Sequence, residues 1–244
     1  MSTSLGVLPR IDVLHLARVT GVPTFHPEHT TFRPFPVYAF VVRHPDRPFV
    51  VDTGIGFENH LIDSLYPHSA TRLVDELNRH DVDERDVQFI VNSHLHFDHC
   101  GQNSALSCPV VVQRAEVDAA QQPGYTVAEW AHVPPARAVV LAGDTELAPG
   151  VTALLAPGHT PGHQAVIVRG GDDVVVIAAQ CIFRQEAWHA GPEATNLHDA
   201  TWAADAAESL ARLRALRPRR VLLSHDAPIA PANGPSVDPR RIDH

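Results

Sequence analysis

Three histidines and an aspartate lie within six residues near the middle of the sequence. The segment His94-Leu-His96-Phe-Asp98-His99 comes shortly after an apolar run that ends at Val91. Imidazole nitrogens and carboxylate oxygens are the ligands that Zn²⁺ and similar divalent ions prefer. In an extended chain His94 and His96 point to one side, whereas Asp98 and His99 can turn toward a second ion. The spacing therefore predicts that one segment supplies part of two metal sites.

Two further histidines follow apolar runs elsewhere in the chain. His159 lies in the segment Pro-Gly-His-Thr-Pro-Gly-His, which ends at His163. His225 lies in a Ser-His-Asp segment just after the apolar residues 221–223. Alone, each would be an ordinary loop histidine, but together with the first cluster they complete two sets of metal ligands.

The composition is that of a globular protein. The 244 residues are 44% hydrophobic and carry a formal net charge of −9, without a basic cluster, which argues against nucleic acid as a partner. Apolar runs stay far below the roughly 20 residues of a membrane helix. Three cysteines without a Cys-x-x-Cys pair fit a reducing compartment. We expect a cytoplasmic, single-domain protein over residues 1–244, a monomer or homodimer with no membrane partner.

Apolar runs with turn signals predict the elements that position these side chains. Two strands joined by a turn are expected between residues 37 and 51, and a helix over residues 69–80. Further strands are expected at residues 87–91, 110–112, 138–141, 151–155, 165–168, 174–177 and 221–223. A helix at residues 202–216 ends before Pro218. This pattern predicts two packed sheets with helices outside, and strand-end loops that meet around a metal-site core at about residues 37–226.

The motifs HLHFDH, VDTG, PGHTPGH and SHD resemble those of the metallo-β-lactamase superfamily, across Asp52 to His225. Within it, HLHFDHCGQN and LLAPGHTPGH are most similar to the N-acyl homoserine lactonase-like branch, whose members open lactone rings at a dinuclear metal centre. The resemblance implies an α/β fold, the αββα four-layer sandwich, in one domain. It also implies a metal-dependent hydrolase of small molecules, with one or two Zn²⁺ ions and a quorum-quenching role.

The resemblance also assigns roles to individual residues. It implies a first metal held by His94, His96 and His159, and a second held by Asp98, His99 and His225. Asp52 and His163 would support the ligands through hydrogen bonds. A metal-bound hydroxide would attack a lactone or ester carbonyl, and Asp98 would be the catalytic group that carries a proton to the leaving oxygen.

The sequence departs from the family pattern at two positions. Gln180 stands where the family carries a bridging aspartate, and Phe183 stands where lactonases of this branch commonly carry a tyrosine. A glutamine oxygen can coordinate an ion but is neutral, so we expect the second metal to bind more weakly. Phe97 and Phe183 are expected to line the pocket. Cys181 could be a metal ligand, as in the zinc β-lactamases, although a packed thiol is the plainer interpretation.

Two alternatives to a lactone or ester hydrolase remain open at this point. The same metals would serve a thioester or amide hydrolase. The altered position at Gln180 would also fit a metal-binding protein without hydrolytic activity. A redox di-iron centre is disfavoured, because the ligand set resembles the hydrolytic one.

Overall fold

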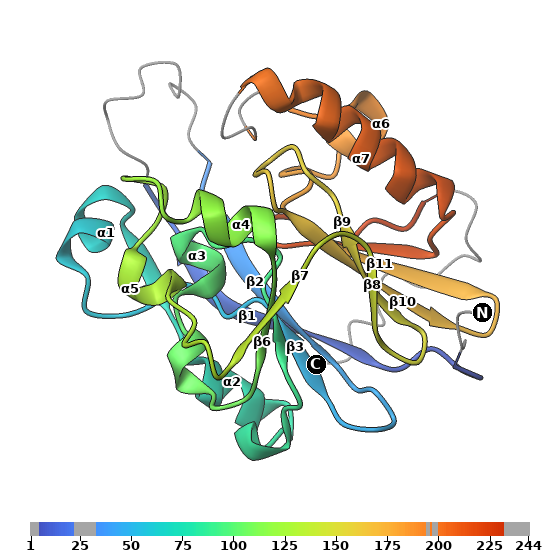
Figure 1. Ribbon diagram of the computed structural model, residues 1–244, viewed down its shortest axis with the longest axis horizontal. Coiled ribbons are helices and arrows are strands. Elements are labelled where there is room, and N and C mark those ends of the chain that lie inside the picture. The colour runs from blue at the N-terminus through green and yellow to red at the C-terminus, as the bar shows by residue number, and fades with distance from the viewer. Residues whose placement is uncertain (1–4, 22–32, 194–195, 197–199, 232–244) are drawn as a thin grey trace. The chain divides into compact units, whose positions relative to one another are not determined.

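The computed structural model describes residues 5–21, 33–193, 196 and 200–231 (Figure 1). The chain forms two compact units, which are treated separately below. The N-terminal unit is Pro9–Ala142, and the C-terminal unit comprises Met1–Leu8 and Gly143–His244. Each unit holds one β-sheet together with helices. The chain is therefore a mixed α/β protein with two sheets, whereas the predicted single domain over residues 1–244 stays a prediction.

The N-terminal unit is built on a seven-stranded sheet with the strand order β4-β1-β2-β3-β5-β6-β7. Its strands are β1 (Ile11–Val19), β2 (Phe35–Val42), β3 (Phe49–Val51), β4 (His68–Ala70), β5 (Ile90–Val91), β6 (Val110–Gln113) and β7 (Ala138–Leu141). Strands β3, β5, β6 and β7 run parallel to one another. Their carboxyl ends therefore share one edge of the sheet, where Asp52 and the histidine cluster follow β3 and β5.

Among its described residues, this unit has five short α-helices: α1 (His60–Leu65), α2 (Leu73–Arg79), α3 (Phe97–Cys100), α4 (Arg114–Ala119) and α5 (Ala128–Ala131). Helix α2 buries Leu73 and Leu77, which lie one turn apart on the same face. These side chains pack in one hydrophobic cluster with Leu14 of β1 and Val41 of β2. Burial of this apolar face holds α2 against the sheet.

The C-terminal unit holds a five-stranded sheet with the order β12-β11-β10-β9-β8. Its elements are β8 (Thr145–Ala148), β9 (Val151–Leu155), β10 (Gln164–Gly170), β11 (Asp173–Ala179), α6 (Ala187–Ala190), α7 (Ala203–Ala215) and β12 (Arg220–Leu223). Helix α7 packs Leu210 and Leu213 in one cluster with Val176 and Val221 of the sheet. None of the helices in the described part of the chain has the length and hydropathy needed to span a membrane.

Most predicted strands are present, and two predicted segments need correction. The helix predicted over residues 69–80 forms only at Leu73–Arg79, because His68–Ala70 pairs with residues 17–19 of β1 as a strand. The strand predicted at residues 87–91 is reduced to Ile90–Val91, because Val87 ends a 3-10 turn. The sequence patterns did not indicate β1 or β8.

The loop after the histidine cluster lies against the loop after β3. Gly101 donates its backbone N–H to the carbonyl of Gly54 at 2.9 Å. A Cβ added at Gly101 would lie 2.1 Å from the nitrogen of Gly56 and 2.7 Å from the oxygen of Gly54. Both contacts are with backbone, which cannot rotate away as a side chain can. Glycine at this position therefore permits the two loops to touch.

Gly101→Ala is expected to lower the free energy of unfolding by about 2–3 kcal/mol, because the two backbones must separate to admit a methyl group. Urea denaturation followed by circular dichroism measures this change. Gly6→Ala is the matched control, since a Cβ at Gly6 meets no heavy atom within 4 Å. Equal stability of the two variants would contradict the close approach.

Candidate metal centre

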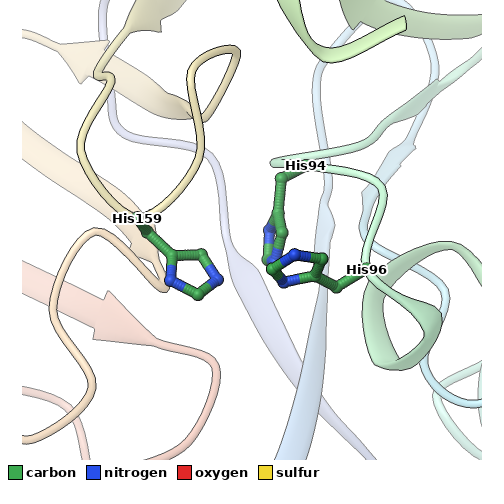
Figure 2. Close-up of side chains that lie close together, drawn as sticks. All are labelled: His94, His96 and His159. Atoms are coloured by element: carbon green, nitrogen blue, oxygen red, sulfur yellow. The ribbon is translucent and has the colours of Figure 1, made fainter. Parts of the chain in front are cut away.

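His94 and His96 lie side by side in the loop between β5 and α3 of the N-terminal unit (Figure 2). Nε2 of His94 is 3.1 Å from Nδ1 of His96, and the two rings meet edge to face at 81°. His94 is completely buried. At this separation the two nitrogens can share a proton or can both turn a lone pair toward a cation. This geometry agrees with the prediction that His94 and His96 point to the same side of the chain.

Asp98 and His99 belong to the short helix α3, whose four residues follow His96 directly. Both side chains are largely buried, and Nε2 of His99 is 3.7 Å from Oδ2 of Asp98. The helical turn directs Asp98 and His99 differently from the extended residues before them. One short segment thus presents four candidate ligands, although their assignment to two metals stays a prediction.

Asp52 holds this segment from the end of β3. Its Oδ1 accepts the backbone N–H of Ser93 at 2.7 Å, and its Oδ2 accepts the hydroxyl of Ser93 at 2.7 Å. Oδ2 also accepts Nδ1–H of His99 at 2.8 Å. The carboxylate is fully buried, on a backbone with φ of 62°. These contacts fit the supporting role predicted for Asp52, because they orient His99 and the start of the histidine segment.

Glu116 holds the same segment from helix α4, and the sequence analysis missed it. This fully buried carboxylate accepts the backbone N–H of Leu95 at 2.8 Å and the hydroxyl of Tyr125 at 2.5 Å. The ring of Tyr125 lies 4.9 Å from the ring of His96. Glu116 therefore fixes the peptide between two candidate ligands. A glutamate in a helical segment gives no sequence signal for such a contact.

His159 lies in the loop between β9 and β10 of the C-terminal unit, and Figure 2 shows its imidazole projecting from that loop. Its Nδ1 is hydrogen bonded to the backbone carbonyl of Asn196. The buried ring of His163 lies 6.2 Å away, at 83° to that of His159. The supporting role of His163 stays a prediction.

The loop that carries His159 touches helix α7 of the same unit. Gly158 has φ of 142°, and a Cβ there would lie 2.5 Å from both Cα and Cβ of Ala206. Ser209 of the same helix donates its hydroxyl to the carbonyl of Pro157 at 2.7 Å. The close approach of this loop to helix α7 therefore requires two small residues, Gly158 in the loop and Ala206 in the helix.

His225 follows β12, and its side chain meets the loop after β11. Nε2 of His225 is 3.1 Å from Oε1 of Gln180. The ring of Phe183 stacks on His225 with a centroid separation of 4.8 Å. Gln180 thus contacts a candidate ligand within this unit, although its own role as an altered ligand stays a prediction. Phe183 contacts the same histidine, and its pocket role likewise stays a prediction.

Phe97, the other predicted pocket residue, packs on Tyr66 of the N-terminal unit. The ring centroids are 4.7 Å apart. Burial raises the pKa of Tyr66, and the nearby negative charge of Asp98 raises it further. The phenol therefore stays protonated at neutral pH. A role for Phe97 in binding a substrate stays a prediction.

Cys181 lies in the hydrophobic cluster of the C-terminal unit, together with Ile182 and Trp188. Burial raises the pKa of its thiol to about 12. A thiolate is the form that binds metal, and this thiol stays neutral at physiological pH. The contacts agree with the interpretation of Cys181 as a packed thiol.

The donor set fits a divalent metal ion. Three candidate ligands have Nδ1 next to an oxygen: His94 next to the Ser93 hydroxyl at 3.1 Å, His99 next to Asp52, and His159 next to a backbone carbonyl. Metal-binding histidines commonly use one nitrogen in this way and turn the other toward the ion. The described residues include histidine-rich groups that could hold a metal ion.

Comparison with known proteins gives consistent matches. Residues 32–225 match the family model described as the metallo-beta-lactamase superfamily. An N-acyl homoserine lactonase of Bacillus sp. is 35% identical over 146 residues, which is 54% of this chain and 58% of the relative. The chain thus spans 58% of the length of this curated relative.

Solved structures match over nearly the whole chain. One is an N-acyl homoserine lactone hydrolase with N-hexanoyl-L-homoserine bound at its catalytic metal centre, with a TM-score of 0.76 and 23% identity. It covers 90% of this chain and 94% of that chain. Another, a quorum-quenching N-acyl homoserine lactone lactonase, has a TM-score of 0.75 and 24% identity, over 93% and 94% of the two chains.

Asp52→Asn is expected to lower the free energy of unfolding by about 2–3 kcal/mol. Asparagine tolerates the positive φ, but one of its terminal atoms is an NH₂ group that faces donors from Ser93 or His99. Urea denaturation measures the change. The control Asp173→Asn weakens a partly exposed pair with Arg219 and should cost less than about 1 kcal/mol. A loss at Asp52 no greater than at Asp173 would refute the supporting role.

Proposed function

Because the chain belongs to the metallo-beta-lactamase superfamily, we propose that it is a metal-dependent hydrolase that opens the ring of an N-acyl homoserine lactone. The observation that carries the proposal is the set of buried histidines whose Nδ1 atoms face oxygens, the arrangement that metal-binding histidines commonly use. The predicted mixed α/β fold of this superfamily, with two sheets, is confirmed by the family match and the solved structures.

We propose the two ligand sets that the sequence resemblance implies. One ion would be held by His94, His96 and His159, and the other by Asp98, His99 and His225. Zn²⁺ is the metal that suits this mixture of imidazole nitrogen and carboxylate oxygen. When bound, such ions lower the pKa of water and polarise a carbonyl oxygen.

The protein's own side chains would orient the reactants and move protons. Water adds to the lactone carbonyl carbon, and the bond from that carbon to the ring oxygen breaks. Asp98 would take the proton from the attacking water at a carboxylate oxygen and deliver it to the leaving ring oxygen. Asp52 and Glu116 would keep the histidine segment fixed during these steps. The product carries a new hydroxyl group and a carboxylate, so each turnover releases a proton.

The substrate class rests on the relatives. The matched relative and the matched structures are named as acting on N-acyl homoserine lactones, which supports a lactone over the alternative thioester, amide or non-hydrolytic roles. The cytoplasmic location stays a prediction that rests on three free cysteines, and the oligomeric state, monomer or homodimer, stays a prediction too.

His94→Ala is expected to abolish lactone opening by the zinc-loaded protein, because it removes a buried ligand that both Ser93 and His96 orient. Proton release from an N-acyl homoserine lactone in weakly buffered solution measures the reaction. His80→Ala is the matched control, since His80 lies at the end of α2 beside Glu76 and should keep the wild-type rate.

The comparison between the two variants separates catalysis from spontaneous ring opening. Proton release by the wild type that persists in His94→Ala would contradict metal-dependent catalysis. Turnover of an acyl thioester without turnover of the lactone would replace the proposed substrate by the thioester alternative.

Gln180→Asp is expected to strengthen binding of the weaker of two zinc ions by at least about tenfold, because it adds a negative charge beside the candidate ligand His225. Calorimetric titration of metal-free protein with zinc measures both affinities. Two ions that bind tightly to the wild type and resist a mild chelator would contradict the predicted effect of Gln180.

A further inference from the structure

Asn196 connects two loops of the C-terminal unit that carry candidate ligands. Its side chain is buried, with 4% of the residue exposed. The Nδ2 group donates to the backbone carbonyl of Gln180 at 2.9 Å and lies 3.5 Å from the carbonyl of Cys181. Its own backbone carbonyl accepts Nδ1–H of His159. Asn196 therefore contacts both the loop after β11 and the loop before β10.

These contacts determine which way the Asn196 amide faces. Backbone carbonyls only accept hydrogen bonds, so the atom that faces Gln180 O and Cys181 O must be the NH₂ group. The oxygen Oδ1 then lies on the other side, where it accepts Nε2–H of Gln180 at 3.2 Å. A rotated Asn196 amide would place oxygen against oxygen at both carbonyls.

The orientation of Asn196 fixes that of Gln180 in turn. With its NH₂ group directed at Asn196, the Gln180 side chain presents Oε1 to His225 at 3.1 Å. In the metal-free protein Nε2 of His225 must then carry the proton that this contact requires. The side chains of Asn196, Gln180 and His225 thus form a chain of hydrogen bonds that begins at backbone carbonyls. The donor and the acceptor of each hydrogen bond are fixed by the one before it.

The direction matters because the two ends of a carboxamide behave oppositely toward a cation. The oxygen end attracts a positive ion, whereas the NH₂ end repels it. We propose that Asn196 is a positioning residue that turns the oxygen of Gln180 toward His225, and so makes a neutral side chain at position 180 compatible with a cation there. The cation itself rests on the proposed function, whereas the orientation of Gln180 and the proton on His225 do not.

Asn196→Leu tests the proposal, because leucine has a similar volume and no hydrogen-bonding group. Zinc titration of the metal-free variant is expected to show the weaker affinity reduced about tenfold, since the Gln180 amide can then rotate and present its NH₂ group. Thermal unfolding confirms that the variant is folded. Asn196→Ala removes the same amide and replaces the leucine variant if that one does not fold.

The Gln180→Glu background separates positioning from a general structural role. Both terminal atoms of glutamate are oxygens, so its orientation no longer decides what faces His225. In that background Asn196→Leu should leave the weaker zinc affinity unchanged or raise it, because Oδ1 of Asn196 would otherwise face a carboxylate. Equal losses of affinity in both backgrounds would overturn the proposal.

A second measurement needs neither metal nor substrate. Nitrogen NMR of the histidine rings in metal-free protein, at mildly alkaline pH, reports which ring nitrogen of His225 carries the proton. The wild type should show it on Nε2, and Asn196→Leu should show both tautomers. A proton that stays fully on Nε2 in the variant would overturn the proposal. Absence of lactone opening would overturn only the proposed function, because this measurement does not depend on activity.

Discussion

A carboxylate without water must be surrounded by hydrogen-bond donors, and the N-terminal unit is arranged around this requirement at Asp52 and Glu116. Each is fully buried, and each takes its donors from the residues around the histidine cluster. An unpaired buried charge costs several kcal/mol. Asp52 holds Ser93 and His99, and Glu116 holds Leu95 between them, so the segment cannot shift without exposing one carboxylate to an unfavourable environment. The same negative charges favour a cation nearby.

In the C-terminal unit, two candidate ligands contact neutral groups. His159 is held by a backbone carbonyl, and His225 contacts the carboxamide of Gln180. A neutral acceptor contributes orientation but little electrostatic attraction. Carboxylates thus hold part of the histidine segment in the N-terminal unit, and amide groups contact candidate ligands in the C-terminal unit. The glutamine at position 180 fits this second pattern, because an amide partner at Asn196 gives it a fixed direction.

The sequence predicted those parts of the fold that depend on local apolar runs. The predicted strands at residues 138–141 and 151–155 coincide with β7 and β9, because a short apolar run bounded by turn residues specifies both ends. The expected helix at residues 69–80 began too early, because pairing of His68–Ala70 with β1 outweighs the helical pattern. Such pairing depends on residues about 50 positions away and has no local signal.

The same distinction applies to the candidate site. Histidine and aspartate spacing indicated the ligand types, whereas the contacts of Glu116 and Asn196 depend on where backbone groups of other loops lie. The packed thiol expected at Cys181 lies just beyond β11, which ends at Ala179 with φ of 48°. A turn, rather than the alternation of a strand, places this thiol in the hydrophobic cluster.

The contact between Gly158 and Ala206 limits how freely an outer helix can change. Most of α7 lies at the surface, and its exposed positions can be altered to improve solubility or to attach a tag without disturbing the sheet. Position 206 is different, because any larger side chain there would displace the loop that carries His159. A library that diversifies this helix should therefore keep alanine at position 206, even though that residue bears no reactive group.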